Sequence, residues 1–271
     1  MRLLMRSLCL PLHLILFLAG GLSGQSLISL EYWNFNDVAG KSFDTGANDG
    51  MANSGDNSTH WNLGGTGSNS METDGNGNFV ISNHTGQTYR KLPDPGYTTA
   101  YSSGKYRLEM NFTSWDLDNS SNGAMGMELV DASNARVLSF TLGVDTNDSS
   151  KGKFQFAGIS EGSTRQDKLI YGNQTVDLSH STRYGIAIEF DFDNDTLEFF
   201  ADGNSIRTVT DFNATEFSQL KFFTNNPWTA NSTVSLDSMG LLQIPEPETY
   251  ALTLGLLLLL ALSARPLFRV G

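Results

Sequence analysis

Two stretches of alternating residues constrain the fold of this chain more than any other feature. From Lys105 to Thr113 every second residue is large and apolar, and the residues between them are polar. From Tyr184 to Asp193 large apolar residues again alternate, here with small and acidic ones. A period of two places successive side chains on opposite faces of a β-strand. The pattern therefore predicts strands that bury one face against a core.

Shorter runs of the same kind predict more strands, and no segment between residues 25 and 244 has helical periodicity. The runs cover residues 30–35, 79–82, 126–130, 137–144, 153–159, 169–171, 197–201, 205–209, 220–224 and 234–241. Polar turns are predicted at residues 118–123, 145–152 and 193–195, and Asp202-Gly203 is a hairpin signal because both residues tolerate positive φ. Many short strands joined by Gly- and Asn-rich turns favour an all-β, two-sheet sandwich or jelly roll.

The N-terminus has the three parts of a secretory signal peptide, which we place at residues 1–24. Arg2 and Arg6 give a positive start, residues 8–18 are apolar, and residues 19–24 are mostly small. Cleavage after Gly21, Gly24 or Ser26 fits equally well. The one cysteine of the chain, Cys9, lies inside the apolar run. The body, residues 25–244, therefore contains no cysteine, and its stability must come from burial or bound ions.

The chain is acidic, with a formal net charge of −12. Its acidic residues all lie in or next to the body, whereas Arg2, Arg6, Arg265 and Arg269 lie outside it. The body is therefore more acidic than the whole chain. Nucleic acid is not expected as a partner, because binding to phosphates depends on Lys and Arg.

The C-terminus, residues 245–271, combines a rigid stop, an apolar run and a basic tail. Pro245-Glu246-Pro247 comes first, and each proline fixes φ and favours extended geometry in the residue before it. Residues 249–264 are uncharged and Leu-rich, a little shorter than the roughly 20 residues of a full membrane span. Arg265 and Arg269 follow and place the tail in the cytoplasm by the positive-inside rule.

This order of parts at the very C-terminus resembles the PEP-CTERM sorting signal of Gram-negative bacteria, which an exosortase recognises. The resemblance implies a transient inner-membrane intermediate that signal peptidase and exosortase process, with Pro245, Glu246 and Pro247 as the recognition segment. The two separated arginines form a sparser cluster than the family usually has. The alternative is an ordinary C-terminal anchor in which the prolines only interrupt a linker.

The body also resembles a known family in its central hairpin. Residues 184–203 form an alternating strand, an acidic turn and a second strand that ends in aromatic-x-Asp-Gly. This is similar to the central hairpin of concanavalin-like, laminin-G-like jelly rolls. Residues 32–36 resemble the first strand of that family, and residues 234–240 resemble the last, which returns to pair beside the first. The same sandwich hosts sugar-binding modules, adhesion domains and glycosidases, so the resemblance implies a fold and not one function.

The least regular part of the body is the Gly-, Asn- and Ser-rich segment 37–78. It is expected to be either a long ordered loop over one mouth of the sandwich or a flexible segment. Trp61 is its candidate carbohydrate-binding residue, because an aromatic face can stack on the C–H surface of a sugar. The alternative is that Trp61 packs the loop onto the sandwich, which is the commoner role of tryptophan.

Three acidic groups are candidates for chemistry. Glu189, Asp191 and Asp193 resemble the Glu-x-Asp-x-Glu signature of laminarinase-type glycosidases, but Asp193 stands where that family has its acid Glu. We interpret them as a solvated strand face, and the body as no enzyme. Calcium, which prefers oxygen ligands, could be held by one of two groups or by neither, since solvated turns explain both. The two groups are Asp116, Asp118 and Asn122, and Asp145, Asn147 and Asp148.

These observations together predict an exported cell-surface or matrix protein whose body is a carbohydrate-binding or structural jelly roll. Extracellular polysaccharide is the expected surrounding. The alternatives from other classes are a secreted laminarinase-like glycosidase and an adhesion module that stays anchored in the membrane.

Overall fold

The computed structural model describes residues 27–36, 39–40, 61–64, 71–82, 88–91, 101–119, 124–133, 136–158, 169–210, 216–225, 232–245 and 255. The chain divides into two compact units, Ser29–Gln243 and Met1–Ile28 together with Ile244–Gly271. The first unit is the body. The described residues include no helix long and apolar enough to cross a membrane. The predicted signal peptide at 1–24 lies outside them, as does the predicted helix at 249–264 apart from Gly255.

One sheet of the body, here called sheet A, has its long strands in the middle. Its order is β14 (Asn204–Val209), β13 (Thr196–Ala201), β12 (Tyr184–Asp191), β6 (Lys105–Asp116), β16 (Thr233–Ile244), β4 (Phe79–Ser82) and β3 (Met71–Thr73). In addition β1 (Ile28–Trp33) pairs with β16, and β11 (Ser179–His180) pairs with β6. The last strand, β16, thus pairs with the first, β1, as the resemblance to the jelly-roll family implies.

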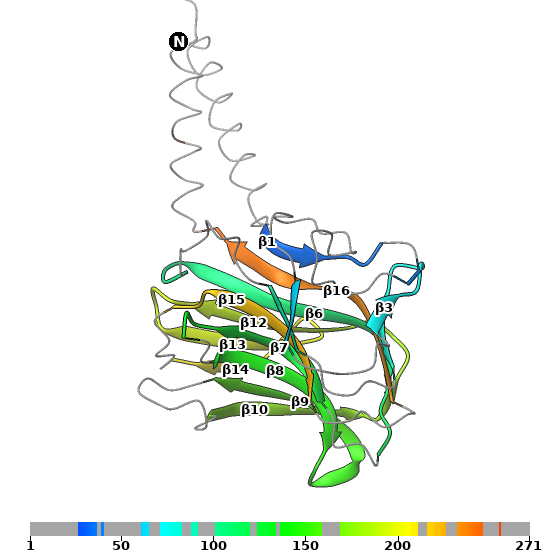
Figure 1. The fold of residues 1–271 in the computed structure, drawn as a ribbon. Helices are drawn as coiled ribbons and strands as arrows, with labels where there is room; N and C mark the ends of the chain where they lie inside the picture. The colour runs from blue at the N-terminus through cyan, green and yellow to red at the C-terminus, as the bar shows by residue number, and fades with distance from the viewer. Residues whose placement is uncertain are drawn as a thin grey trace, which may run out of the picture. The chain divides into compact units, whose positions relative to one another are not determined.

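In the second sheet, sheet B, every strand pairs antiparallel with its neighbours. Its order is β10 (Leu169–Asp177), β9 (Asp148–Gly158), β8 (Arg136–Asp145), β7 (Ala124–Val130), β15 (Gln219–Asn225), β5 (Thr88–Lys91) and β2 (Trp61–Gly64). Figure 1 shows the two sheets as two layers. The described part of the body is therefore all-β, as predicted.

The core lies between the two sheets and is built from the alternating positions. In β6, Leu108, Met110 and Phe112 are fully buried, and the polar residues between them face outward. Aromatic rings from the two sheets meet directly: the centroids of Phe112 and Phe154 are 5.3 Å apart, and those of Phe156 and Phe199 are 4.8 Å apart. Burial of these side chains is the main stabilising term for a body without cysteine.

The central hairpin is confirmed. β12 and β13 pair antiparallel from Ile186 and Ala201 to Asp191 and Thr196, where the acidic turn joins them. The predicted Asp202-Gly203 turn joins β13 to β14, and its φ values of 49° and 76° are the two successive positive values that a type I′ turn requires. The long strands β6 and β12 begin where the alternation predicts, at Lys105 and Tyr184.

Other segments differ from the expectation. The predicted turn at 145–152 is only the two residues Thr146-Asn147, because β8 and β9 continue as a hairpin with exposed polar residues. The strand predicted at 169–171 extends to Asp177 as β10. The segment 37–78 is not one loop, since it contains β2 and β3, and β5 was not predicted at all.

Candidate functional site

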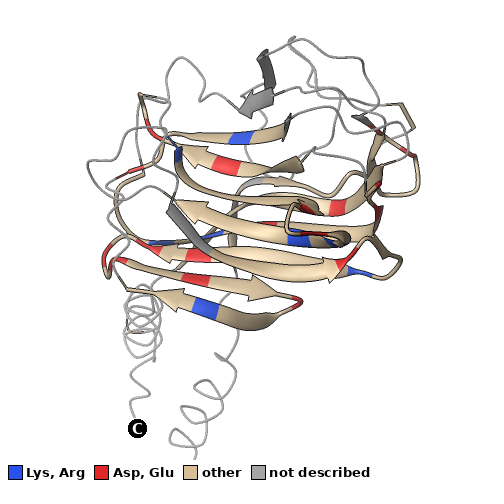
Figure 2. Ribbon diagram, turned by 90° about the horizontal axis from the view of Figure 1, so that it is seen from below, with Lys and Arg blue, Asp and Glu red and all other residues tan. Residues whose placement is uncertain are grey.

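A groove of about 340 Å³ on the outer face of sheet A, away from the core, is the candidate site. It is lined by Arg107, Asn111, Arg183, Gly185, Ile186, Ala187, Phe200, Asp202 and Gly203. These residues come from β6, from β12 and the residue before it, and from β13 with the turn that follows it. Figure 2 shows acidic and basic residues interspersed along the strands of the body.

Strand register explains why the groove is hollow. Gly185 lies opposite Asn111, and Ala187 lies between Glu109 on β6 and Phe200 on β13. Two small residues thus form the floor between larger side chains on the neighbouring strands. A Cβ at position 185 would come within 2.9 Å of Asn111 Oδ1, so glycine is required there for the observed position of Asn111.

The Asp202-Gly203 turn closes one side of the groove. The Asp202 N–H donates a 2.6 Å hydrogen bond to the Gly185 carbonyl, which fixes the turn against β12. Asp202 is exposed, and its carboxylate makes no hydrogen bond or ion pair with any described residue. An exposed carboxylate beside a groove is a ready acceptor for hydroxyl groups.

Arg107 is held on the outer face by two carboxylates. Its Nη1 donates to Glu189 Oε1 at 2.9 Å and its Nε donates to Glu109 Oε2 at 2.7 Å. Burial alone would lower the pKa of Arg107, but the hydrogen bonds and charges of these carboxylates outweigh burial and raise that pKa. The guanidinium carbon lies 5.3 Å from the centroid of the Phe200 ring. Arg107 therefore stays charged and fixes Phe200 by a cation–π contact.

The opposite side of the groove leads toward β16 and β1. Arg183 Nη2 pairs with Asp237 Oδ2 at 2.8 Å, and Asn111 Nδ2 donates to Ser238 Oγ at 3.0 Å. Ser238 also hydrogen-bonds Tyr32 of β1. Burial raises the pKa of Tyr32, and the nearby carboxylates of Glu109 and Asp237 add to that rise. A continuous chain of polar contacts thus joins the groove to the first strand.

The acidic triplet is not the solvated face that the sequence predicts. Both oxygens of Glu189 are engaged, because Lys105 Nζ lies 2.9 Å from Oε2 and Arg107 occupies Oε1. Asp191 is buried, and its Oδ1 accepts the N–H groups of Asp193 and Asn194, both at 3.0 Å. Asp193 lies beyond the end of β12 and accepts the N–H of Gly104 at 2.9 Å. The strand ends at Asp191, so the three carboxylates serve ion pairing and turn formation separately.

In the first calcium candidate, Asp116 and Asp118 make hydrogen bonds with different residues. Asp116 Oδ1 accepts a hydrogen bond from the Ser179 hydroxyl, and the Asp118 N–H donates to Ser232 Oγ at 2.9 Å. Asn122 lies outside the described residues. Within the described ranges, no group of three or more His, Cys, Asp and Glu side chains could hold a metal ion.

The second calcium candidate is a hydrogen-bonded turn. Asp145 Oδ1 accepts the Asn147 N–H at 3.0 Å and pairs with Lys153 Nζ at 3.1 Å. Asp148 Oδ1 likewise accepts the Ser150 N–H at 3.0 Å. These are the turn hydrogen bonds expected from Asp in such positions. Calcium binding stays a prediction at both places.

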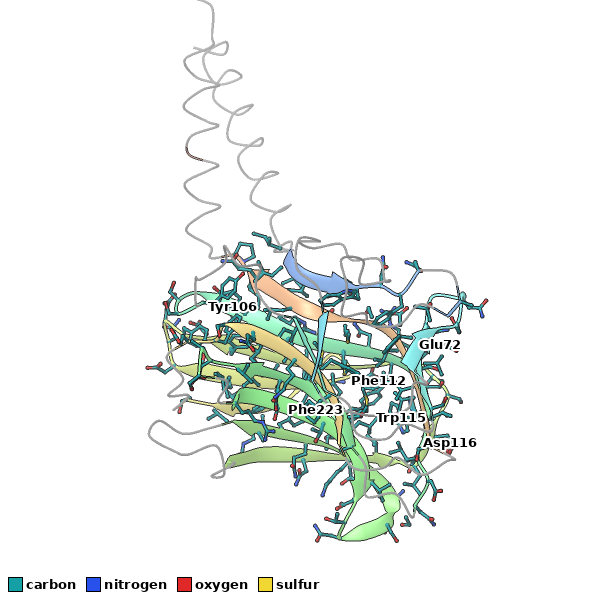
Figure 3. All side chains as sticks on the ribbon, in the orientation of Figure 1. Glu72, Tyr106, Phe112, Trp115, Asp116 and Phe223 are labelled. Atoms are coloured by element: carbon teal, nitrogen blue, oxygen red, sulfur yellow. The ribbon has the colours of Figure 1, made fainter. Side chains whose placement is uncertain are left out.

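The tryptophans Trp61 and Trp115 lie on different strands of the fold. Trp61 begins β2, where its backbone lies opposite Lys91, and its side chain is outside the described part, so its role in sugar binding stays a prediction. Trp115 is buried near the end of β6, beside Asp116 (Figure 3), and its Nε1 donates to the Asp177 carbonyl at 2.9 Å. Of the sorting residues only Pro245 is described. Glu246, Pro247, Arg265 and Arg269 lie outside the described residues.

Sequence reasoning missed the groove residues Asn111, Arg183, Phe200 and Asp202 as site residues. The alternation does place Asn111 and Gly185 on the outer faces of their strands. What it lacks is the strand order and register, which bring β6, β12 and β13 together. The signal that was available is the pair of small residues Gly185 and Ala187 on an outward face.

No family model and no curated protein matches the chain. Among solved structures, the CBM2 module of the evolved Dit of Lactobacillus casei BL23 phage J-1 matches with a TM-score of 0.52 and 11% identity, covering 81% of this chain and 97% of that one. The receptor-binding domain of a botulinum neurotoxin C/D mosaic serotype matches with a TM-score of 0.52 and 8% identity, covering 83% of this chain and 50% of that one. At these identities both show similarity of fold alone, and the fold is jelly-roll-like.

A Bacillus licheniformis β-glucanase is also similar, with a TM-score of 0.43 and 11% identity, covering 80% of this chain and 99% of that one. That TM-score is too low to support an argument about fold or activity. The fold alone does not distinguish a binding module from an enzyme, so the site itself must distinguish the two classes.

Proposed function

We propose that the body is a carbohydrate-binding module that takes a neutral glycan in the groove of sheet A. The observation that carries this proposal is the groove's combination of groups: the exposed Asp202 carboxylate, the Arg183 guanidinium and the Phe200 ring line one hollow. Sugar recognition uses such a mixture, because hydroxyl groups need donors and acceptors while the C–H face of the ring needs an apolar surface.

A neutral glycan fits the charges better than an acidic one. Arg107 and Arg183 are the cations that line the groove, and each is already paired with a carboxylate. Asp202 and Asp237 add negative charge at its borders, and the chain as a whole has a net charge of −12. An anionic sugar would meet repulsion without an uncompensated cation to offset it.

Binding without hydrolysis fits the carboxylates. Retaining and inverting glycosidases need two carboxyl groups that reach the scissile bond. Glu189 uses both oxygens in ion pairs, Asp191 uses its carboxylate to form a turn, and neither lines the groove. The body is therefore proposed to be a binding module and not an enzyme.

The two terminal segments support a proposal about where the protein acts. Signal peptidase would remove residues 1–24, and the segment 249–264 would hold the chain in the inner membrane until exosortase processes it at Pro245-Glu246-Pro247. The module would then act at the cell surface or in extracellular polysaccharide. The support is the order of stop, apolar run and basic tail in the sequence.

Affinity electrophoresis of the full-length protein in mild detergent tests the binding proposal. Gels containing barley β-glucan, a neutral polysaccharide, should retard the wild type, and gels containing alginate, an anionic one, should not. Phe200→Ala and Asp202→Asn should each reduce retardation, whereas Thr175→Ala, an exposed change on β10 of sheet B, should not. No retardation of the wild type on β-glucan, or retardation of both groove variants as strong as that of the wild type, would refute the proposal.

A further inference from the structure

We infer that the site extends across sheet A from Phe200 to Tyr32 and binds an internal stretch of a polysaccharide chain. This inference rests on the proposed function and adds the form of the ligand. Tyr32 is not among the residues that line the groove, so its part in the site follows only from its position and contacts.

Strand order places the two aromatic residues in one row. Phe200 lies opposite Ala187, and Ala187 lies opposite Glu109, so the first part of the row crosses β13, β12 and β6. The next step is the hydrogen bond from Asn111 to Ser238 of β16, and the last is the hydrogen bond between Ser238 and Tyr32 of β1. The row thus crosses five neighbouring strands, with a shift of two residues along β6 from Glu109 to Asn111, whose Nδ2 donates to Glu109 Oε1 at 3.4 Å.

Tyr32 faces the same side of sheet A as the groove. Its neighbour Trp33 is fully buried in the core, so alternation turns Tyr32 outward, where it is half-buried. The charges of Glu109, Asp237 and Arg183 act on its hydroxyl. Arg183 also lines the groove and pairs with Asp237, so the residues whose charges act on Tyr32 reach the groove.

The length of the row decides what it can bind. Four strand spacings of roughly 4.8 Å separate β13 from β1, which gives about 19 Å between the two aromatic positions across the strands, and the shift along β6 adds to this. A single sugar ring cannot contact both ends of such a row. Several linked sugar units can, with their outer rings at Phe200 and Tyr32 and their hydroxyl groups over the polar residues between. The chain axis would then run across the strands.

Titration calorimetry with β-glucan fragments tests this extension, using two-residue and six-residue oligosaccharides prepared from barley β-glucan. The full-length wild type should bind the longer fragment about tenfold more tightly, which corresponds to roughly 1.4 kcal/mol. Tyr32→Ala should remove this preference, Tyr32→Phe should retain it, and Phe200→Ala should weaken binding of both fragments. Thr175→Ala is the control, and thermal unfolding shows whether each variant folds.

The two ways of failing are distinct. Equal affinity of the wild type for both fragments refutes the extended site without any variant, and so does an unchanged preference in a folded Tyr32→Ala protein. Binding of neither fragment, or binding that Phe200→Ala leaves unchanged, refutes the groove as the sugar site and the extension with it.

Discussion

Gly185 controls the shape of the groove at the scale of a single residue. A side chain there would press on Asn111 Oδ1, since a Cβ would come within 2.9 Å of it. Asn111 also holds Ser238, so its displacement would disturb the row toward Tyr32. We expect Gly185→Ala to weaken β-glucan binding at least about tenfold, or 1.4 kcal/mol, while thermal stability falls little. Affinity electrophoresis together with thermal unfolding measures both effects.

Gly203 is the matched control, because it lines the same groove but is needed for a different reason. Its φ is +76°, and an added Cβ would meet nothing within 4 Å. Gly203→Ala should therefore cost about 1–2 kcal/mol of stability from the left-handed conformation. If Gly185→Ala and Gly203→Ala show the same ratio of lost affinity to lost stability, Gly185 has no specific role in positioning Asn111.

Glu128 makes a different prediction, because it is buried on sheet B beside two cations. It contacts Lys221 of β15 directly, and Arg136 Nε donates to it at 2.7 Å. Burial by itself raises the pKa of Glu128, but the two cations outweigh burial and lower it below its ordinary value. A folded pKa below the unfolded one means that this group stabilises the body fully above the ordinary Glu pKa of about 4.3, and progressively less below it.

Thermal unfolding between about pH 2.5 and 6 tests the Glu128 prediction. The wild type should lose stability steeply as the pH falls below the ordinary Glu range. Glu128→Gln should be less stable by about 3–5 kcal/mol at pH 6, because it removes the carboxylate that pairs with the buried Lys221, and its acid dependence should be shallower. Parallel pH curves for the two proteins would show that Glu128 does not carry this acid sensitivity.

The turn between β12 and β13 is the element that the acidic triplet forms. Asp191 accepts hydrogen bonds from the Asp193 and Asn194 N–H groups and from Asn194 Nδ2, the last at 2.9 Å. Asp191→Ala should cost about 1–2 kcal/mol, as loss of a helix-cap acceptor does, and Asp191→Asn should cost less because one acceptor oxygen remains. Urea denaturation compares the two. Equal stability of Asp191→Ala and wild type would contradict this role.

Sequence predicts those strands whose alternation reflects burial. β6 and β12 were recognisable because one face of each packs on the core, and the Asp202-Gly203 turn because its residues tolerate positive φ. β10 was predicted too short because Val176 is the one large apolar residue among its half-buried positions after Tyr171, so residues 172–177 show no clear apolar alternation. β2, β3 and β5 are held by pairing with neighbours, and pairing leaves no local pattern.

The candidate site was predictable only in part for a related reason. Its outward residues on β6 and β12 follow from the alternation, yet the groove depends on which strands are neighbours. Arg107, Glu109 and Glu189 show the difference most clearly. In the sequence they are isolated charges, and in the fold they form one network that holds Phe200.

At the scale of the whole molecule, the prediction concerns sorting. Replacing Pro245-Glu246-Pro247 with three alanines removes both φ constraints and favours helix in the segment that exosortase would recognise. We expect the variant to be exported but to accumulate uncleaved in the inner membrane. Membrane fractionation with intact-mass analysis measures this, and Pro227→Ala in the body is the control. Release of the triple-alanine variant, processed as the wild type is, would show that Pro245-Glu246-Pro247 is only a linker.

The most direct test of the central claim is a crystal structure of the protein with the six-residue β-glucan fragment. The claim is that the outer face of sheet A is the glycan surface of the body. We predict sugar density across the strands, with one ring against Phe200, hydroxyl groups within hydrogen-bond distance of Asp202, and a second ring against Tyr32. Sugar bound elsewhere, at sheet B or on Trp61, with an empty groove on sheet A, would contradict the claim.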